Sequence, residues 1–305
     1  MSNNNISKYR KEFLVTDSVI FLNHAAVSPI PLWAKKNLYE YARIICAQGS
    51  QSHKKSLEYL KNARLNGATI LGCTKEEVSF VKSTTHGIIL CAQGIPFKEG
   101  DNVIIPENEF PANVVPWLAL RKRGVEVRFV KQKDNIFEID DFYALVDKKT
   151  KAISVSFVEY STGFRNQLQK LGEICTEKGI FLIVDGIQGV GVIPLNVKEC
   201  GISFMSLDSH KWLLGPEGIG YFYADKNAIN KIDNIFEGWL SKENPSDYSN
   251  YEQKSKSSAE RFEEGAYNFA GIFGLAGSTN LIIEAGIENI YEHVQTLLDS
   301  FSEMI

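Results

Sequence analysis

The feature that most constrains the fold is the alternation of short apolar runs with amphipathic segments. Runs with the length and composition of buried strands stand at 19–22, 78–81, 102–106, 125–130, 152–157, 180–185, 202–207 and 218–223. Most are separated by segments whose aliphatic residues recur every three or four positions, as in a helix with one buried face. The clearest are 52–71, 85–94, 111–123 and 166–178. This order predicts a three-layer α/β/α domain with a mostly parallel sheet.

Two later regions differ from this alternating pattern. Segment 241–260 is polar and rich in Ser, Lys and Glu, which predicts an exposed excursion or loop. Beyond it, 269–285 and 287–304 have helical patterns, with Gly286 at the break between them. Because ligands of open α/β sheets bind beyond the carboxyl ends of the strands, functional residues are expected in the loops that follow strands.

Composition narrows the partners of the 305-residue chain. A formal net charge of -4 gives no basic surplus for nucleic acid or an acidic membrane surface, so small molecules are the expected partners. Five cysteines, none in a CxxC pair, indicate reduced thiols and no metal cluster. The first residues lack a signal-peptide pattern, and no apolar run is long enough to span a membrane. We therefore expect a soluble, cytoplasmic protein.

A carboxylate and a lysine follow successive predicted strands. Asp185 ends the run IFLIVD, and Lys211 stands 211 − 185 = 26 residues later, in SLDSHKWLLGPEG. This pair suits pyridoxal phosphate (PLP): a buried carboxylate keeps the ring nitrogen protonated, so that the ring can accept electrons. The lysine carries the cofactor as a Schiff base and later moves a proton at the substrate α-carbon. Lys211 is thus the predicted catalytic residue.

A phosphate site is predicted where VKSTTHGI passes from a strand into a helix. Thr84 and Thr85 would offer hydroxyls and backbone N–H groups at the positive end of that helix, which favours a phosphate dianion. The same residues would also serve as an ordinary helix cap, and the motif alone does not decide between the two.

Five motifs together resemble one known family: FLNHAAVSP, STTHGI, VDGIQGVG, SHKWLLGPEGIG and RFEEGAYNFAG. They are similar to the class V, fold-type I PLP enzymes, which include cysteine desulfurases, selenocysteine lyases and isopenicillin-N-epimerase-like proteins. The resemblance covers roughly residues 17 to 290. It implies the large domain of a fold-type I PLP-dependent transferase, and a homodimer with active sites at the subunit interface.

The resemblance also implies roles for single residues. Besides the Schiff base of Lys211 and the ring-nitrogen contact of Asp185, it implies a hydrogen bond from Gln188 to the phenolic oxygen of PLP. Ser209 and His210 would approach the phosphate from the loop of the lysine.

Other matched positions depart from the family pattern. Phe110 stands where desulfurases place a histidine over the cofactor ring, and an aromatic face can stack there as well. Tyr160 replaces an asparagine that faces the phenolic oxygen. Asp208 replaces a phosphate-binding serine, and Ala266 a threonine that many members contribute from the neighbouring subunit. Asp208 would repel a phosphate, or else orient a backbone amide or His210.

Candidate substrate contacts come from two places. Asn23 and His24 follow the first apolar run, where family members position the substrate. Arg165 has the forked guanidinium that suits a substrate carboxylate, although an arginine that opens a helix is often only a surface residue.

The resemblance ends where the chain would enter the C-terminal small domain of the family, 305 − 211 = 94 residues after the lysine. In relatives this domain supplies an arginine for the substrate carboxylate and, in desulfurases, the cysteine that receives sulfur. We expect an N-terminal arm (1–16), a PLP-binding large domain (17–286) and a helix leading into a truncated small domain (287–305). A shortened enzyme, a split enzyme whose small domain is a separate chain, and an incomplete product would all fit.

The predicted function is a PLP-dependent enzyme acting at the α-carbon of an amino acid or related amine, by epimerase, aminotransferase or lyase chemistry. One alternative is a cysteine desulfurase or selenocysteine lyase. Another is a family member that has lost turnover and acts as a binding or partner subunit.

Overall fold

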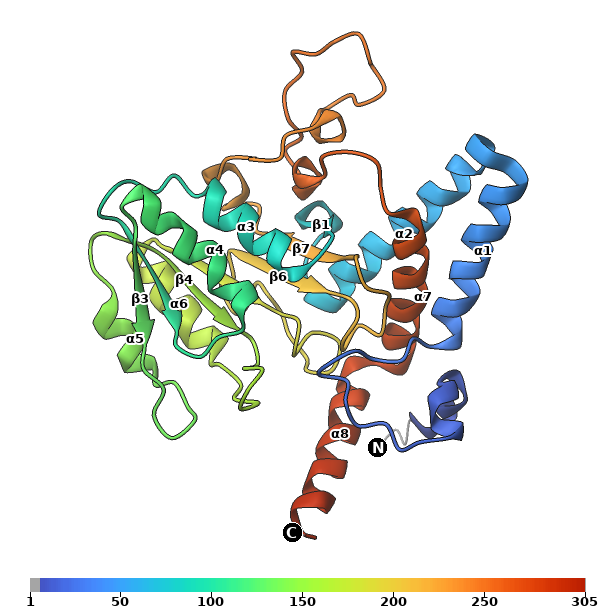
Figure 1. Cartoon of the computed structure of the whole chain (residues 1–305), viewed down its shortest axis with the longest axis horizontal. Coiled ribbons are helices and arrows are strands. Elements are labelled where there is room, and N and C mark those ends of the chain that lie inside the picture. The colour runs from blue at the N-terminus through green and yellow to red at the C-terminus, as the bar shows by residue number, and fades with distance from the viewer. Residues whose placement is uncertain (1–5, 305) are drawn as a thin grey trace.

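The chain forms one seven-stranded sheet with helices on both faces, as Figure 1 shows. The computed structural model describes residues 6–304. The sheet order is β1-β7-β6-β5-β4-β2-β3, and every neighbouring pair is parallel except those that β7 makes with β1 and β6. The strands are β1 (Val78–Val81), β2 (Asn102–Pro106), β3 (Glu126–Val130), β4 (Thr150–Ser156), β5 (Phe181–Asp185), β6 (Phe204–Asp208) and β7 (Gly220–Ala224). The predicted mostly parallel sheet is confirmed.

The strand predicted at 19–22 is wrong. This segment is neither helix nor strand, and the side chains of Ile20 and Leu22 are 87% and 85% exposed. An apolar run becomes a strand only where a neighbour accepts its backbone hydrogen bonds, and no strand within residues 6–304 pairs with this one. Instead the chain runs across the loop after β6, where Ser28 N donates to His210 O at 2.8 Å.

Most predicted helices are present. They are α2 (His53–Leu71), α3 (Thr84–Gly94), α6 (Leu168–Lys178), α7 (Phe269–Ala285) and α8 (Ile287–Ser302), and the chain also forms α1 (Leu32–Gln48) and α5 (Ile139–Leu145). The helix predicted at 111–123 is instead a series of short turns around α4 (Val115–Leu118). Pro111 and Pro116 lack the N–H that a continuous helix needs, which explains the interruption.

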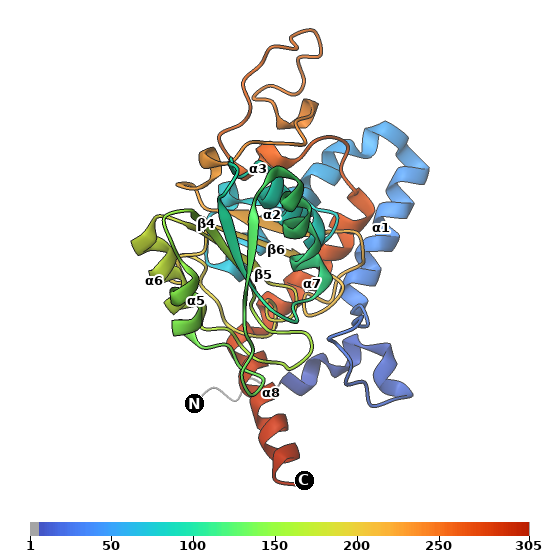
Figure 2. The ribbon, with the colours of Figure 1, turned by 60° about the vertical axis from the view of Figure 1, so that its left-hand side comes forward.

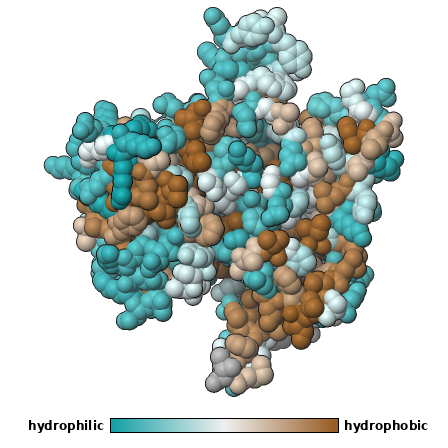
Figure 3. All heavy atoms as spheres, in the orientation of Figure 1, coloured by the Kyte–Doolittle hydropathy of each residue, from teal (hydrophilic) through white to brown (hydrophobic). Residues whose placement is uncertain are grey.

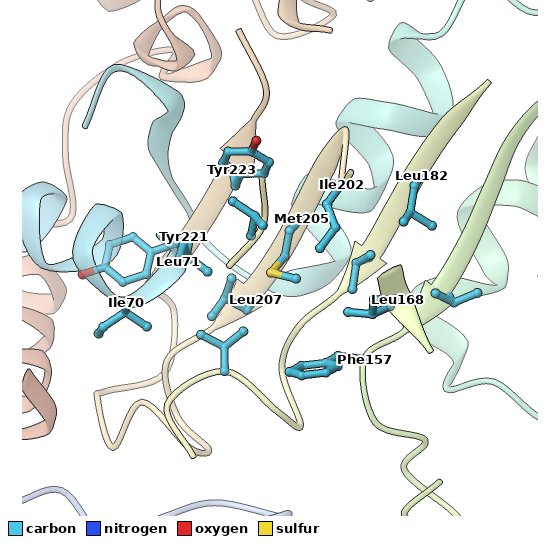
Figure 4. Close-up of a cluster of buried hydrophobic side chains, with 14 of the residues drawn as sticks. Ile70, Leu71, Phe157, Leu168, Leu182, Ile202, Met205, Leu207, Tyr221 and Tyr223 are labelled. Carbon is cyan, nitrogen blue, oxygen red and sulfur yellow. The ribbon is translucent and has the colours of Figure 1, made fainter. Parts of the chain in front are cut away.

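Two apolar cores sandwich the sheet. One lies under α2, α6 and α7, and part of it is drawn in Figure 4, where Leu182, Met205, Leu207 and Tyr221 project from the strands. The other lies under α3 and α4 and includes Trp117 and Phe262. The strands β2, β6 and β7 are buried along their whole length, as expected for a sheet covered on both faces. This confirms the three-layer α/β/α architecture, which Figure 2 shows from another side.

Helix α3 lies very close to β6 because Gly87 has no side chain. A Cβ atom at this position would lie 2.2 Å from the Oγ of Ser206. That hydroxyl donates to the carbonyl of Thr84 at 2.9 Å. The start of α3 is therefore fixed directly against the end of β6, where the predicted phosphate site and lysine loop meet.

The periphery is less tightly packed. The polar segment predicted to be an exposed excursion forms the irregular loop at the top of Figure 1, with a single bridge between Lys242 and Ser255. Apolar side chains gather over the N-terminal arm and the neighbouring region in Figure 3. Among residues 6–304 no single helix could cross a membrane. Helices α7 and α8 taken together have the length and apolar composition of a membrane span, but the chain bends by 75° between them.

Candidate functional site

The predicted site residues converge at one edge of the sheet. Phe110 follows β2 and Tyr160 follows β4, whereas Asp185 and Asp208 are the last residues of β5 and β6. Lys211 comes three residues after β6. Because β2, β4, β5 and β6 run parallel, their carboxyl ends meet at this edge.

Asp185 is a buried carboxyl group, and no cation within residues 6–304 is in ion-pair contact with it. It is 2% exposed, and its Oδ1 accepts a hydrogen bond from Ile187 N at 3.0 Å. Burial raises the pKa of Asp185 to about 6, although the positive charge of Lys211 opposes this rise. A buried carboxylate is costly unless a positive group compensates it. This position therefore suits a ligand that brings a cationic group.

Lys211 faces Asp185 from a half-buried position. Burial lowers the pKa of Lys211, while the charges of Asp185 and Asp208 act in the opposite direction. Its Nζ lies 5.6 Å from the centre of the Phe110 ring, which meets the Tyr160 ring edge-on at 5.3 Å. A lysine whose pKa is lowered by burial is the kind that reacts as a neutral amine. The structure thus brings together the lysine, the aromatic ring and the carboxyl group expected from sequence.

The loop that carries Lys211 is held tightly. Leu214 N donates to Lys211 O at 3.1 Å, and Leu214 itself adopts a left-handed φ of 56°. Gly191 packs against the loop with a φ of 104°, and a Cβ there would lie 2.4 Å from Trp212 O. The hydroxyl of Ser209 is fully buried and donates to Pro216 O. The hydroxyl of Ser209 therefore stabilises its own loop, and the predicted approach of Ser209 to a phosphate stays a prediction.

The two threonines of the predicted phosphate site differ in their contacts. The hydroxyl of Thr84 accepts from Asp208 N at 3.0 Å, whereas Thr85 is half-buried in the first turn of α3. The first N–H groups of a helix have no partner within it, which leaves them available to an anion. Asp208 Oδ1 accepts from Ser209 N at 2.6 Å and lies 3.1 Å from His210 Nδ1, without the alignment of a hydrogen bond.

The segment 21–28 crosses the lysine loop as a strap. Gln188 uses both ends of its amide there: Nε2 donates to Ala25 O at 3.1 Å, and Oε1 accepts from Trp212 Nε1 at 3.2 Å. The ring of His24 stacks on Trp212 at 5.2 Å, and burial lowers the pKa of His24. Gln188 and His24 are thus at the site. The amide of Gln188 would have to exchange partners to meet a phenolic oxygen.

Two predicted substrate residues have other surroundings. Asn23 is exposed, and its carbonyl accepts from Ala26 N at 3.4 Å within the strap. The guanidinium of Arg165 lies 5.5 Å from the centre of the Phe157 ring and lines a hollow together with Glu199 and Cys200. Arg165 makes no hydrogen bond or ion pair with Lys211 or Asp185, so its geometry does not support the predicted carboxylate contact.

Sequence reasoning missed two buried acids at the same edge, Glu109 and Glu159. They are 5% and 2% exposed and lie in the loops after β2 and β4. The available signal was an acidic residue shortly after a buried strand, in the segments NEFP and VEYS.

The model of the family described as aminotransferase class-V matches residues 20–305. The chain belongs to this family. It is 28% identical to a probable cysteine desulfurase of Methanothermobacter thermautotrophicus, over 93% of this chain and 72% of that protein. It is 30% identical to a cysteine desulfurase of Klebsiella pneumoniae, over 92% and 71%. The apo structure of a cysteine desulfurase from Thermococcus onnurineus superposes with a TM-score of 0.88 at 26% identity, over 97% and 75%.

These matches confirm the predicted family, the fold-type I architecture, the PLP cofactor and the class of enzyme. The residues of this chain fit PLP at the ring end, where the buried Asp185 has no cation of the described residues in ion-pair contact and Lys211 faces it. At the phosphate end the start of α3 is favourable, whereas the carboxylate of Asp208 is not.

Proposed function

We propose that Lys211 binds PLP covalently and that the chain acts at the α-carbon of an amino acid or related amine. The observation that carries the proposal is the half-buried Lys211, which faces the buried carboxyl group of Asp185, with which no lysine or arginine in the described part of the chain forms an ion pair. The cofactor, when bound, supplies an electron sink for charge that develops at the α-carbon.

The other residues would hold the cofactor. Asp185 would pair with the ring nitrogen, and Phe110 would stack on the ring beside Tyr160. Thr85 and the free N–H groups of α3 would bind the phosphate. His210 would approach the phosphate from the loop of the lysine, with its Nδ1 3.1 Å from the carboxylate of Asp208.

Lys211 would also move the proton of the reaction. Its amine is neutral more often than that of an exposed lysine, because burial lowers its pKa. A neutral amine can take the α-proton and return it to the same or another atom, which decides between epimerase, aminotransferase and lyase outcomes.

The test begins with the full chain incubated with PLP and reduced with borohydride, which makes the lysine linkage permanent. Peptide mass mapping should find the cofactor on Lys211 and lose it in Lys211→Ala, but not in Lys170→Ala, which removes an exposed lysine of α6. A screen of amino acids in D₂O should then reveal deuterium at the α-carbon. A chain that takes up no PLP, or carries it on another lysine, would refute the proposal. Uptake on Lys211 without α-deuteration would favour the binding or partner subunit.

Cysteine desulfurase activity is the second candidate, because the relatives named above carry that name. Alanine and sulfide released from cysteine would establish it. Three of the five thiols are poor candidates for a sulfur acceptor, since Cys91 and Cys175 are buried and burial raises the pKa of Cys73 to about 12, whereas Cys46 is exposed. Deuterium exchange without sulfide release would exclude it.

The assembly and the domain division also remain proposals. We infer a homodimer, or a separate chain supplying a small domain, from the family resemblance and from the apolar side chains of Ile20 and Leu22 beside the site. The proposed arm (1–16) and helical extension (287–305) each include residues outside the described range, 1–5 and 305. Light scattering of the purified chain, alone and with PLP, would measure the assembly.

A further inference from the structure

Two buried glutamates adjoin Asp185 at the site. Glu109 stands three residues beyond β2, and Glu159 stands three residues beyond β4. Strand β4 pairs with β5, and the register places Ser156 opposite Asp185. Three acids from neighbouring loops and strand ends are therefore gathered on one edge of the sheet.

Neutral donors hold Glu109 in place. Its Oε1 accepts from Ser156 N at 2.5 Å and from Asn113 Nδ2 at 3.0 Å, and its Oε2 accepts from Ser156 Oγ at 2.6 Å. Asn113 is itself fixed, because its Oδ1 accepts from Ser154 Oγ at 2.6 Å and from Trp117 Nε1 at 3.2 Å. The carboxyl group of Glu109 thus has a built site that brings no positive charge.

Glu159 is held in a similar way. Its Oε1 accepts from Asn166 Nδ2 at 2.6 Å, and the same amide donates to Ser156 O at 2.9 Å. Ser156 therefore contacts Glu109, adjoins Asp185 across the strands and shares Asn166 with Glu159. The three acids are linked through this one residue.

The charged groups around the cluster do not neutralise it. No lysine or arginine within residues 6–304 lies within 4.0 Å of a carboxylate oxygen of Glu109, Glu159 or Asp185. Lys211 attracts Asp185 electrostatically from beyond that distance, and it attracts Asp208 as well.

Burial and mutual repulsion both favour the neutral forms of the two glutamates. Burial raises the pKa of Glu109 to about 7, and the charge of Asp185 adds to the rise. Burial raises the pKa of Glu159 to about 9, and the charge of Glu109 adds to that rise. The guanidinium of Arg165 lies 5.5 Å from the centre of the Phe157 ring and makes no hydrogen bond to any of the three acids. If all three acids were ionised, three negative charges would lie close together in a buried space, which is unfavourable.

We propose that Glu109, Glu159 and Asp185 form one proton-sharing cluster, in which the two glutamates are positioning residues that set the charge of Asp185. When a cation is held against Asp185, the cluster releases a proton to solvent, and the proton returns when the cation leaves. That this cation is the ring of PLP rests on the proposed function. The cluster itself does not depend on it.

A double-mutant cycle on the full chain stripped of PLP tests the cluster. Glu109→Gln and Asp185→Asn keep the shapes of the side chains and remove their charges. At pH 8 each single variant should raise the urea concentration at the midpoint of unfolding. The double variant should gain less stability than the two single variants together. The difference should be about tenfold in the unfolding equilibrium constant, which corresponds to a coupling of about one pKa unit. At pH 5, where protonation removes most of the repulsion, the effects should add.

The matched control is Glu107→Gln, which removes an acid two residues earlier that pairs with Lys131 at the surface. Its effect should add to that of Asp185→Asn at both pH values. Glu159→Gln provides a second cycle if Glu109→Gln does not fold, measured at about pH 10 because the pKa of Glu159 is raised to about 9. Additive effects in every cycle that can be measured, at a pH where both of its acids are ionised, would overturn the cluster.

A second readout uses the chain with PLP bound. Loss of the nearby negative charge of Glu109 should move the pH midpoint of the visible absorbance of bound PLP by about one unit to lower pH in Glu109→Gln. An unchanged midpoint in this variant would overturn the influence of Glu109 on Asp185. A chain that binds no PLP would contradict the proposed function, while the cycle in the stripped chain would still decide on the cluster.

Discussion

Asp185→Asn should make the chain without cofactor more stable and its binding of PLP weaker. The pKa of Asp185 is raised from 3.8 to about 6 in the folded chain, mainly by burial. Because the folded chain then binds more protons than the unfolded chain between these values, stability falls as pH rises from about 4 through about 6. A shift of about two units at about 1.4 kcal/mol each costs about 3 kcal/mol at pH 8 and about 1 kcal/mol at pH 4.5.

Asparagine removes this cost and can still accept the hydrogen bond from Ile187 N. For a chain of this size the gain at pH 8 corresponds to roughly 6 °C in Tm. The same variant should bind PLP at least about tenfold more weakly, because it lacks the charge that would pair with the ring nitrogen.

Thermal unfolding at pH 4.5 and pH 8 and a fluorescence titration with PLP would measure both effects. Asp299→Asn, at an exposed position of α8, is the control and should change neither. The reasoning fails if Asp185→Asn leaves Tm at pH 8 unchanged or lowers it, or if PLP binds as tightly as before.

Three further substitutions probe the loops around the site. Asp208→Ser should tighten PLP binding by about tenfold, since it removes a like charge near the phosphate position, and an unchanged affinity in a PLP titration would place the phosphate elsewhere. Glu263→Gln should lower the free energy of unfolding in urea by about 3–5 kcal/mol, because it breaks the buried pair with Arg64 at 2.7 Å; a loss below about 1 kcal/mol would contradict this. Gly191→Ala should lower Tm and slow the borohydride trapping of PLP on Lys211, because its methyl group would lie 2.4 Å from Trp212 O at a φ of 104°; a normal Tm would show that the loop can shift.

The sequence predicted the parts of the site that depend on local pattern. Asp185 at a strand end, Lys211 in a glycine-flanked loop and Thr85 at a helix start are all found where the alternation of strands and helices puts them. Whether a run forms a strand also depends on a neighbour, and 19–22 has none within residues 6–304.

The sequence also could not predict the directions in which side chains point. Ser209 and Arg165 occupy plausible positions along the chain, but their side chains contact Pro216 and Phe157. Glu109 and Glu159 were overlooked because an acid after a strand usually faces water. Only the folded structure reveals that both are buried against Ser156 and Asn166.

The strap over the lysine loop has a consequence for how the protein is made. Gln188, which holds Ala25, lies 163 residues further along the chain. At about 5–20 residues per second, the ribosome needs about 8–33 s to reach it after the strap has been synthesised. Throughout that interval the strap lacks both the amide of Gln188 that holds Ala25 and the Trp212 ring on which His24 stacks, so it cannot take up its final position. The site is closed last, when its N-terminal strap finally meets residues made much later.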